Sequence, residues 1–175
     1  KRIQNAILPS ESVLKENLGE HFIFYKPKDI VAGDFYWSLR VGDAVYFAVC
    51  DCTGHGVPGA MVSMMCHNAL NRSVKEFELT ETGQILDKTR ENLQLDLDAQ
   101  NKAVADGMDI GLCKITANEL QYSGAYIPLW LISDGTLTEV KGNKQPIGKF
   151  DNPLPYTSHT FELQKGDTIY IFSDG

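Results

Sequence analysis

Three aspartates stand at the edges of apolar runs, each close to a glycine. Asp51 ends the run over residues 44–50, Asp34 opens the run that begins at residue 35, and Asp174 follows the last apolar run. If the three strands lie together, their carboxylates converge on one end of a sheet. Mg²⁺ and Mn²⁺ prefer such oxygen ligands. Two such ions about 3.5–4 Å apart can activate a water and clamp a phosphoryl group.

An aspartate beside a glycine is also typical of an ordinary turn. Asp109, Asp134 and Asp167 have similar neighbours, and we interpret all three as turn or surface residues. The three aspartates at the strand edges are harder to explain as turns alone. The sequence therefore predicts a metal cluster built from them.

The glycine-rich loop after Asp51 supports a competing hypothesis. Residues 54–59 satisfy G-x-G-x-x-G between a strand and a helix, as in a dinucleotide-binding fingerprint. A Rossmann unit alternates strands with helices, whereas residues 108–172 contain six strand-like runs and no helical pattern. Asp51 would also repel a diphosphate unless a cation intervened. Nucleotide binding therefore stays the weaker alternative.

Cys52 and His55 in the same loop suggest a zinc site or a thiol nucleophile. A structural zinc needs four ligands at recognisable spacing, and the four cysteines form no CxxC pair. The other three cysteines lie within apolar runs and are interpreted as small buried hydrophobes. For Cys52, the backbone carbonyl is expected to matter more than the thiol.

The elements that position these residues follow from hydrophobic patterning. Helices are expected over residues 3–7, over 60–70, and from Thr80 or Thr82, with Leu86, Leu93 and Leu97 on one face. Strands are expected over residues 22–25, 35–39, 44–50, 108–115, 120–123, 129–132, 136–140, 156–163 and 168–172. This order of strands, two helices and many consecutive strands predicts an α+β fold with antiparallel sheets.

Composition limits the classes of function. The 175 residues fit one globular domain, with 43% hydrophobic and 22% charged residues. The net charge of −7 argues against nucleic-acid binding and against an anionic membrane surface. An acidic protein that acts on phosphates needs a metal to reverse the local sign. Without an export signal or a spanning apolar run, we expect a cytoplasmic protein, or the cytoplasmic part of a larger sensor.

Three motifs carry a resemblance to a known family. They are Gly-Asp-Phe-Tyr at residues 33–36, Asp-Cys-Thr-Gly-His-Gly-Val-Pro-Gly-Ala at 51–60 and Phe-Ser-Asp-Gly at 172–175. Together they resemble the SpoIIE-type domain, a bacterial branch of the metal-dependent (type 2C, PPM) protein serine/threonine phosphatases. The Gly-x-x-x-Pro-Leu stretch at residues 124–129 is similar to that family as well. The resemblance covers residues 1–175 as one catalytic domain, with residues 1–9 similar to the preceding linker helix.

The resemblance implies a four-layer α-β-β-α sandwich of two antiparallel sheets flanked by helices. It also implies a site for two ions, Mn²⁺ or Mg²⁺. Asp51 would bridge them, Cys52 would lend its backbone carbonyl, Asp174 would hold one ion, and Asp34 would ligate directly or through water. His55 could donate a proton to the leaving alcohol.

The implied reaction is attack of a metal-bound hydroxide on phosphoserine or phosphothreonine, without a phosphoenzyme. The implied substrate is a phosphorylated protein, often an anti-sigma-factor antagonist. An upstream sensor domain is expected in the full-length protein, and a dimerising helix there would give a homodimer. No nucleic-acid partner is expected.

One departure from the family pattern concerns the end of the sequence. The pattern continues past residues 173–175 and supplies a further aspartate ligand, whereas this sequence ends at Gly175. We therefore expect the parent protein to be a phosphatase, and this fragment, truncated at the C-terminus, to bind metal weakly and to be inactive. The alternatives are a catalytically silent regulatory domain of the same fold and a phosphatase for small phosphorylated molecules.

Overall fold

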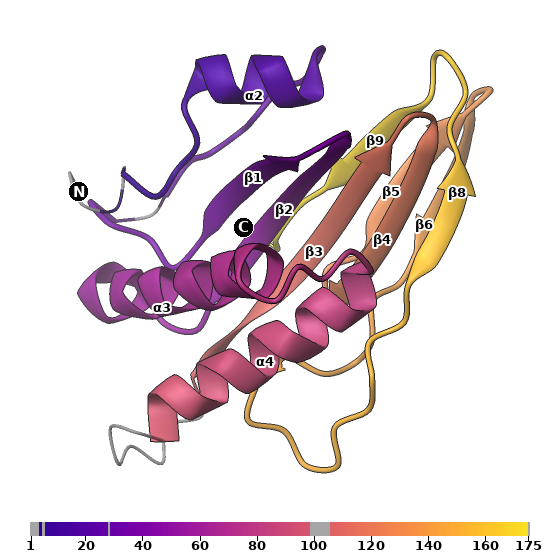
Figure 1. Ribbon diagram of the computed structural model, residues 1–175. Coiled ribbons are helices and arrows are strands. Elements are labelled where there is room, and N and C mark those ends of the chain that lie inside the picture. Colours follow the sequence, from indigo (N-terminus) through magenta and orange to yellow (C-terminus); the bar gives the residue numbers. More distant parts are fainter. Residues whose placement is uncertain (1–3, 5, 28, 99–105, 175) are drawn as a thin grey trace.

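The computed structural model describes residues 4, 6–27, 29–98 and 106–174. Within them lie three helices, α2 (Glu11–Leu18), α3 (Gly56–Lys75) and α4 (Thr82–Asp98) (Figure 1). The strands are β1 (Phe35–Val41), β2 (Ala44–Cys52), β3 (Gly107–Thr116), β4 (Glu119–Ala125), β5 (Leu129–Ser133), β6 (Thr136–Val140), β7 (Ile147–Gly148), β8 (His159–Glu162) and β9 (Thr168–Ile171).

The described strands form two antiparallel sheets. The larger sheet has the order β1-β2-β3-β4-β8, with β7 paired to the end of β3, and the smaller has the order β6-β5-β9. Strand β2 is apolar on both faces because it lies inside the larger sheet and is covered on both sides. The predicted α+β class and the antiparallel order are confirmed.

Each face of the larger sheet has its own apolar cluster. Phe35, Cys50 and Leu112 point toward α3 and α4, and they share a cluster with buried residues of both helices. The opposite face packs on the smaller sheet, where Cys113 and Tyr122 belong to the same cluster as Leu129 and Ile171 of β5 and β9. The larger sheet therefore lies between helices α3 and α4 on one side and the smaller sheet on the other (Figure 1).

The buried face of α4 follows the predicted spacing. In α4 the buried residues include Ile85, Leu86, Leu93 and Leu97. The helix is anchored to β4, because Thr82 donates its backbone N–H to Gln121 Oε1 at 2.7 Å. None of the described helices has the length and apolar character needed to cross a membrane.

Helix α2 was not predicted from the sequence. Its Ser10 cap accepts a hydrogen bond from the Val13 N–H, and only Leu14 of the helix is buried. The helix packs beside β1 on the side of the smaller sheet, where Asn17 Nδ2 donates to Ser38 Oγ at 3.0 Å. With one buried residue, α2 offers no apolar periodicity that patterning could detect.

The strand predicted over residues 22–25 is wrong. The segment belongs to neither sheet, and Phe22 and Phe24 are 72% and 84% exposed. The run predicted over 156–163 is shorter, since only His159–Glu162 pairs with β4. The helix predicted over 3–7 lies partly outside the described residues; Gln4 is helical, and residues 6 and 7 form a turn.

Candidate metal centre

Strand register places three carboxylates in one row across the larger sheet. Asp51 is the direct cross-strand neighbour of Asp109 in the β2–β3 pair. In the β1–β2 pair, Phe35 lies opposite Cys50, so one further step along the same register sets Asp34 beside Asp51. Cross-strand neighbours project from the same face of a sheet. The carboxylates of Asp34, Asp51 and Asp109 therefore share one face at one end.

This face is the one that packs on the smaller sheet. Gly111, two residues after Asp109, lies so close to the segment that leads into β5 that an added Cβ would be 2.9 Å from Ile127 Cγ2. Ile171 of β9 is also near that position, and Asp174 follows three residues later. The Ser173 hydroxyl donates to Asp34 Oδ2 at 3.3 Å. The end of β9 thus brings Asp174 to the row from the opposite sheet.

The pKa values of Asp51 and Asp109 reflect burial first and the crowding of like charges second. Burial, then the charge and a hydrogen bond of Asp34, then the charges of Asp174 and Asp109, raise the pKa of Asp51 to about 7. Burial and the charge of Asp174 raise the pKa of Asp109 to about 6. Both side chains are only half-buried, so solvent screens part of the repulsion. Even so, the group as a whole favours a cation.

Glycines allow the backbone segments at the site to meet. A Cβ on Gly33 would lie 2.8 Å from the carbonyl oxygen of Cys52 and 2.7 Å from that of Gly54. A Cβ on Gly59 would collide with the same Gly54 carbonyl. Gly54 also has a φ of 84°, which side chains rarely adopt. The glycines of these motifs thus set Asp34 against the loop that follows Asp51.

The Cys52 thiol points away from the carboxylates, into the core cluster beneath α3 and α4. Burial and the neighbouring Cys66 thiol raise its pKa well above the ordinary range. A neutral buried thiol is neither a nucleophile nor a zinc ligand. What Cys52 can offer to the site is its backbone carbonyl, as the resemblance implied.

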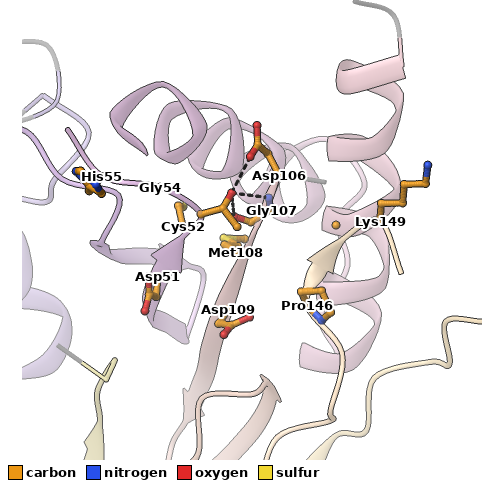
Figure 2. A pocket seen from close by; sticks show the side chains of 12 residues that line it. Asp51, Cys52, Gly54, His55, Asp106, Gly107, Met108, Asp109, Pro146 and Lys149 are labelled. Atoms are coloured by element: carbon orange, nitrogen blue, oxygen red, sulfur yellow. Dashed lines mark hydrogen bonds between the residues drawn. The ribbon is translucent and has the colours of Figure 1, made fainter. Parts of the chain in front are cut away.

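His55 lies outside the carboxylate row, at the N-terminus of α3. Its ring is 79% exposed, and its Nδ1 lies 3.2 Å from Asp29 Oδ2. In Figure 2, His55 and Lys149 flank Asp51 and Asp109 from opposite sides. His55 is thus near the site without contacting the aspartates.

A cavity of about 410 Å³ opens beside the carboxylates (Figure 2). Asp51 and Asp109 line it together with Thr53 and Lys149. Its rim is fixed because the Thr53 hydroxyl donates to Asp106 Oδ1 at 3.1 Å. The cavity is large enough for a phosphate group and part of the chain that carries it.

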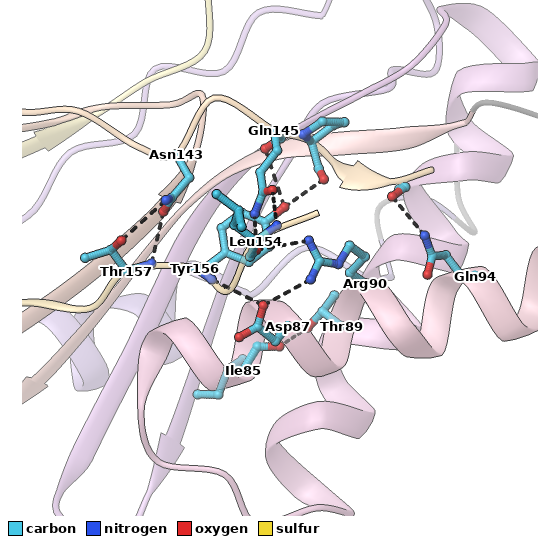
Figure 3. A network of polar contacts seen from close by, with 12 residues as sticks. Ile85, Asp87, Thr89, Arg90, Gln94, Asn143, Gln145, Leu154, Tyr156 and Thr157 are labelled. Carbon is cyan, nitrogen blue, oxygen red and sulfur yellow. Dashed lines mark hydrogen bonds and ion pairs between the residues drawn. The ribbon is translucent and has the colours of Figure 1, made fainter. Parts of the chain in front are cut away.

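The far wall of the cavity is held by α4 (Figure 3). Strand β7 pairs with the start of β3, and Gln94 of α4 donates to the Gly148 carbonyl at 3.1 Å. Farther along, Asp87 Oδ1 accepts from Arg90 Nη2 at 3.3 Å and from the Tyr156 N–H at 3.2 Å. The Tyr156 hydroxyl donates to the Pro146 carbonyl at 2.7 Å. These contacts make the wall part of the scaffold.

Asp109 was wrongly interpreted from the sequence as a turn or surface residue. It lies inside β3, half-buried, and faces the row. The available clue was its place within an apolar strand pattern rather than between two such patterns. Asp134 does lie in a turn, with a φ of 48° before Gly135. Asp167 accepts a hydrogen bond from the Gln164 N–H at 2.8 Å on the surface.

The described structure does not support the two competing hypotheses, dinucleotide binding and a zinc site. The antiparallel larger sheet lacks the parallel β-α-β unit that a dinucleotide fingerprint needs. Within residues 4, 6–27, 29–98 and 106–174, no three His, Cys, Asp or Glu side chains are gathered closely enough to hold an ion. The aspartates thus share one end of the sandwich without forming a tight shell. Their donor chemistry, carboxylates with a backbone carbonyl, fits Mg²⁺ or Mn²⁺ and does not fit zinc.

Comparison with known proteins decides the family. Residues 42–175 match the family described as Stage II sporulation protein E (SpoIIE). The chain belongs to the SpoIIE family. It is 35% identical to the SiaA-PP2C domain of Pseudomonas aeruginosa, with a TM-score of 0.87 over 99% of this chain and 68% of that one.

Two further relatives are more distant. The phosphoserine phosphatase RsbU of Bacillus subtilis (strain 168) is 24% identical over 160 residues, 85% of this chain and 44% of RsbU. The chain thus spans less than half of that relative. RsbX, solved in complex with magnesium, shares the fold at 18% identity and a TM-score of 0.63, over 86% of this chain and 70% of that one. The predicted family is confirmed, and with it the class of metal-dependent protein phosphatase domains.

Proposed function

We propose that the protein is a Mn²⁺- or Mg²⁺-dependent phosphatase that hydrolyses phosphoserine or phosphothreonine in a bacterial signalling protein. The observation that carries the proposal is the meeting of Asp34, Asp51 and Asp174 at one end of the sandwich, beside a cavity. Bacterial SpoIIE-family and PP2C relatives support it.

In this proposal the chain holds two ions through residues of its three motifs. Asp51 lies centrally in the row and would bridge the ions, with Asp34 beside it and Asp174 facing it. The Cys52 carbonyl would add a neutral oxygen. Bound divalent ions supply an activated water and offset the charge of the phosphate. Without them, the carboxylates would repel a phosphate dianion.

His55 would donate the proton that the leaving alcohol needs. Its Nδ1 is next to the Asp29 carboxylate, so Nε2 is the nitrogen left for proton transfer. Proton donation is expected to contribute about 10²–10⁴-fold to a hydrolysis rate. His55→Gln should therefore lower kcat and leave Mn²⁺ affinity unchanged.

The substrate would be a phosphorylated protein, in keeping with the phosphoserine phosphatase RsbU. An anti-sigma-factor antagonist is the partner that we propose, and an upstream sensor would control the activity. Such a pathway operates in the cytoplasm, where the domain would work as part of a homodimer. The acidic composition supports a protein partner rather than nucleic acid.

The decisive experiment is a calorimetric Mn²⁺ titration of the 175-residue chain beside Asp51→Asn, followed by phosphopeptide hydrolysis with the full-length protein. We expect saturable binding that Asp51→Asn abolishes, and hydrolysis of a phosphoserine peptide that EDTA stops. Equal binding by both proteins would remove Asp51 from the site. Metal binding without hydrolysis would favour a silent regulatory domain. Hydrolysis confined to small phosphate esters would favour a small-molecule phosphatase.

A further inference from the structure

We propose that Asp109 is a fourth carboxylate of the metal centre and binds the metal ions together with Asp51. The inference rests on the proposed metal-dependent function and extends its set of ligands. Asp109 belongs to none of the three motifs that carry the family resemblance. It comes instead from the middle strand of the larger sheet.

The position of Asp109 is fixed by the most regular part of the fold. Strands β2 and β3 pair continuously from Ala44–Thr116 to Cys52–Met108, and Asp51 faces Asp109 within that register. Directly opposed residues in an antiparallel pair have Cβ atoms about 4.5–5.5 Å apart. Figure 2 shows the two carboxylates side by side at the cavity. No loop movement is needed to bring Asp109 to the site.

Asp109 has no compensating partner in the described part of the chain. Its half-buried carboxylate makes no hydrogen bond and no ion pair there, although Lys149 lines the same cavity. The residue directly opposite Asp109 in the β2–β3 pair is another carboxylate, Asp51. An unpaired, partly buried carboxylate among like charges destabilises a fold. A bound cation is the partner that would offset it.

The matched case in the same domain is Asp87, which is also half-buried and also has a raised pKa. Asp87 receives hydrogen bonds from Arg90 and from the Tyr156 N–H. The fold therefore supplies partners to a half-buried carboxylate that serves structure. Within the described residues, Asp109 has no such hydrogen-bond donors. Its place beside Asp51 therefore indicates a carboxylate that binds an ion.

The row also gives Asp109 a role distinct from that of Asp34. Asp51 stands between the two, so an ion held by Asp51 and Asp109 would lie on the β3 side of Asp51. An ion held by Asp51 and Asp34 would lie on the β1 side. The β3 side is the one bordered by the cavity and by β7.

The test is Mn²⁺ titration by calorimetry of the 175-residue chain with four proteins: wild type, Asp109→Asn, Asp51→Asn and the surface-turn control Asp134→Asn. We expect Asp109→Asn to weaken Mn²⁺ binding by about tenfold or more. The control should bind as wild type does. Wild-type affinity in Asp109→Asn, with binding lost in Asp51→Asn, would overturn this inference alone. Equal binding by wild type and Asp51→Asn would overturn the proposed metal centre itself.

Thermal unfolding separates a ligand from a structural residue. In EDTA, Asp109→Asn should unfold at or above the wild-type temperature, because the substitution removes a repelled charge. With Mn²⁺ added, its unfolding temperature should rise less than that of wild type. A lower unfolding temperature in EDTA would assign Asp109 to the structure and overturn the inference. Asp109→Glu, which keeps the carboxylate, should retain part of the Mn²⁺-induced rise.

Discussion

Two regions of this domain contain half-buried aspartates with a raised pKa, and the surroundings of these aspartates differ. At α4, Asp87 accepts hydrogen bonds from Arg90 and from the Tyr156 backbone, which ties the segment after β7 to the helix. At the end of the sandwich, Asp51 has carboxylates as its charged neighbours, and the pKa of Asp51 is raised to about 7. The carboxylate in the first region has a charged partner, whereas the proposed metal would provide one in the second.

The difference shows how a functional site can be recognised before any ligand is seen. Strongly perturbed carboxylates without a counter-charge destabilise the domain, so their retention calls for a role outside folding. Asp87 alone would not raise that question, because its partners explain it. Asp51 and Asp109 do raise it, because neither forms an ion pair within the described residues, although Lys149 lines the same cavity. The divalent metal that we propose for this SpoIIE-family chain would fill that role.

Removing one carboxylate charge in each region should give the largest difference in Mn²⁺ affinity. Asp51→Asn should weaken Mn²⁺ binding by about 100-fold or more, because it removes the central carboxylate of the row. Asp87→Asn should leave Mn²⁺ affinity unchanged, since Asp87 does not line the cavity at the carboxylates. Calorimetric titration of both variants measures the contrast. A comparable loss of affinity in Asp87→Asn would mean that the two regions are not independent.

Arg90→Ala tests the compensated region through stability. It leaves Asp87 half-buried without its cation and removes the hydrogen bond from Arg90 Nη1 to the Leu154 carbonyl. We expect the free energy of unfolding to fall by about 1–3 kcal/mol, as measured by urea denaturation. Glu91→Gln is the matched control, because Glu91 pairs with Lys88 on the exposed surface of the same helix. Equal stability of Arg90→Ala and wild type would show that Asp87 needs no compensation.

Without metal, the stability of the domain should fall as the pH rises, because Asp51 and Asp109 are carboxylates without a charged partner among the described residues. Asp51 and Asp109 have pKa values of about 7 and about 6 in the folded chain, against about 3.9 in an unfolded one. The folded state therefore binds more protons between these values, and stability falls as pH rises from about 4 to about 7. Without metal, the unfolding temperature should be higher at pH 5 than at pH 7.5.

Metal should reverse this trend, because only the ionised carboxylates bind Mn²⁺. Mn²⁺ affinity should increase as pH rises toward 7.5, and the Mn²⁺-induced gain in unfolding temperature should increase with it. Differential scanning calorimetry at both pH values, with EDTA or Mn²⁺, measures both effects. The Asp51→Asn variant should show a weaker pH dependence in EDTA. If its pH dependence matched that of wild type, the slope would arise elsewhere in the chain.

The site residues that were predicted from the sequence are those that belong to short local motifs. Asp34, Asp51 and Asp174 each lie at or near the end of a strand. The glycines beside them indicate tight backbone contacts, such as those that Gly33 makes. The structure brings these three aspartates to one end of the sandwich. Asp109 could not be predicted in the same way, because its role depends on the register of β2 against β3. Register is a long-range property that a single sequence does not show.

The elements of the fold also divide into those that a local pattern predicts and those that depend on tertiary contacts. The class and most strands were predicted, since their apolar alternation is strong and their turns are marked. Helix α2 was missed because only Leu14 in it is buried. The strand at residues 22–25 was predicted because its composition suits a strand, but it has no partner to pair with. Exposed segments are held by a few tertiary contacts, such as the Tyr25 hydroxyl on the Asp34 carbonyl, which patterning does not detect.

The smallest expected effect concerns Asp29, which belongs to neither region. It contacts His55 in an exposed pair, so Asp29→Asn should change the free energy of unfolding by less than about 1 kcal/mol. If the carboxylate orients the His55 ring, the variant should lower kcat severalfold and shift the pH profile of hydrolysis, with Mn²⁺ affinity unchanged. Kinetics of the full-length protein on a phosphoserine peptide, beside calorimetry, measure both. An unchanged pH profile would leave His55 without a positioning partner, and weaker Mn²⁺ binding would instead extend the metal centre to Asp29.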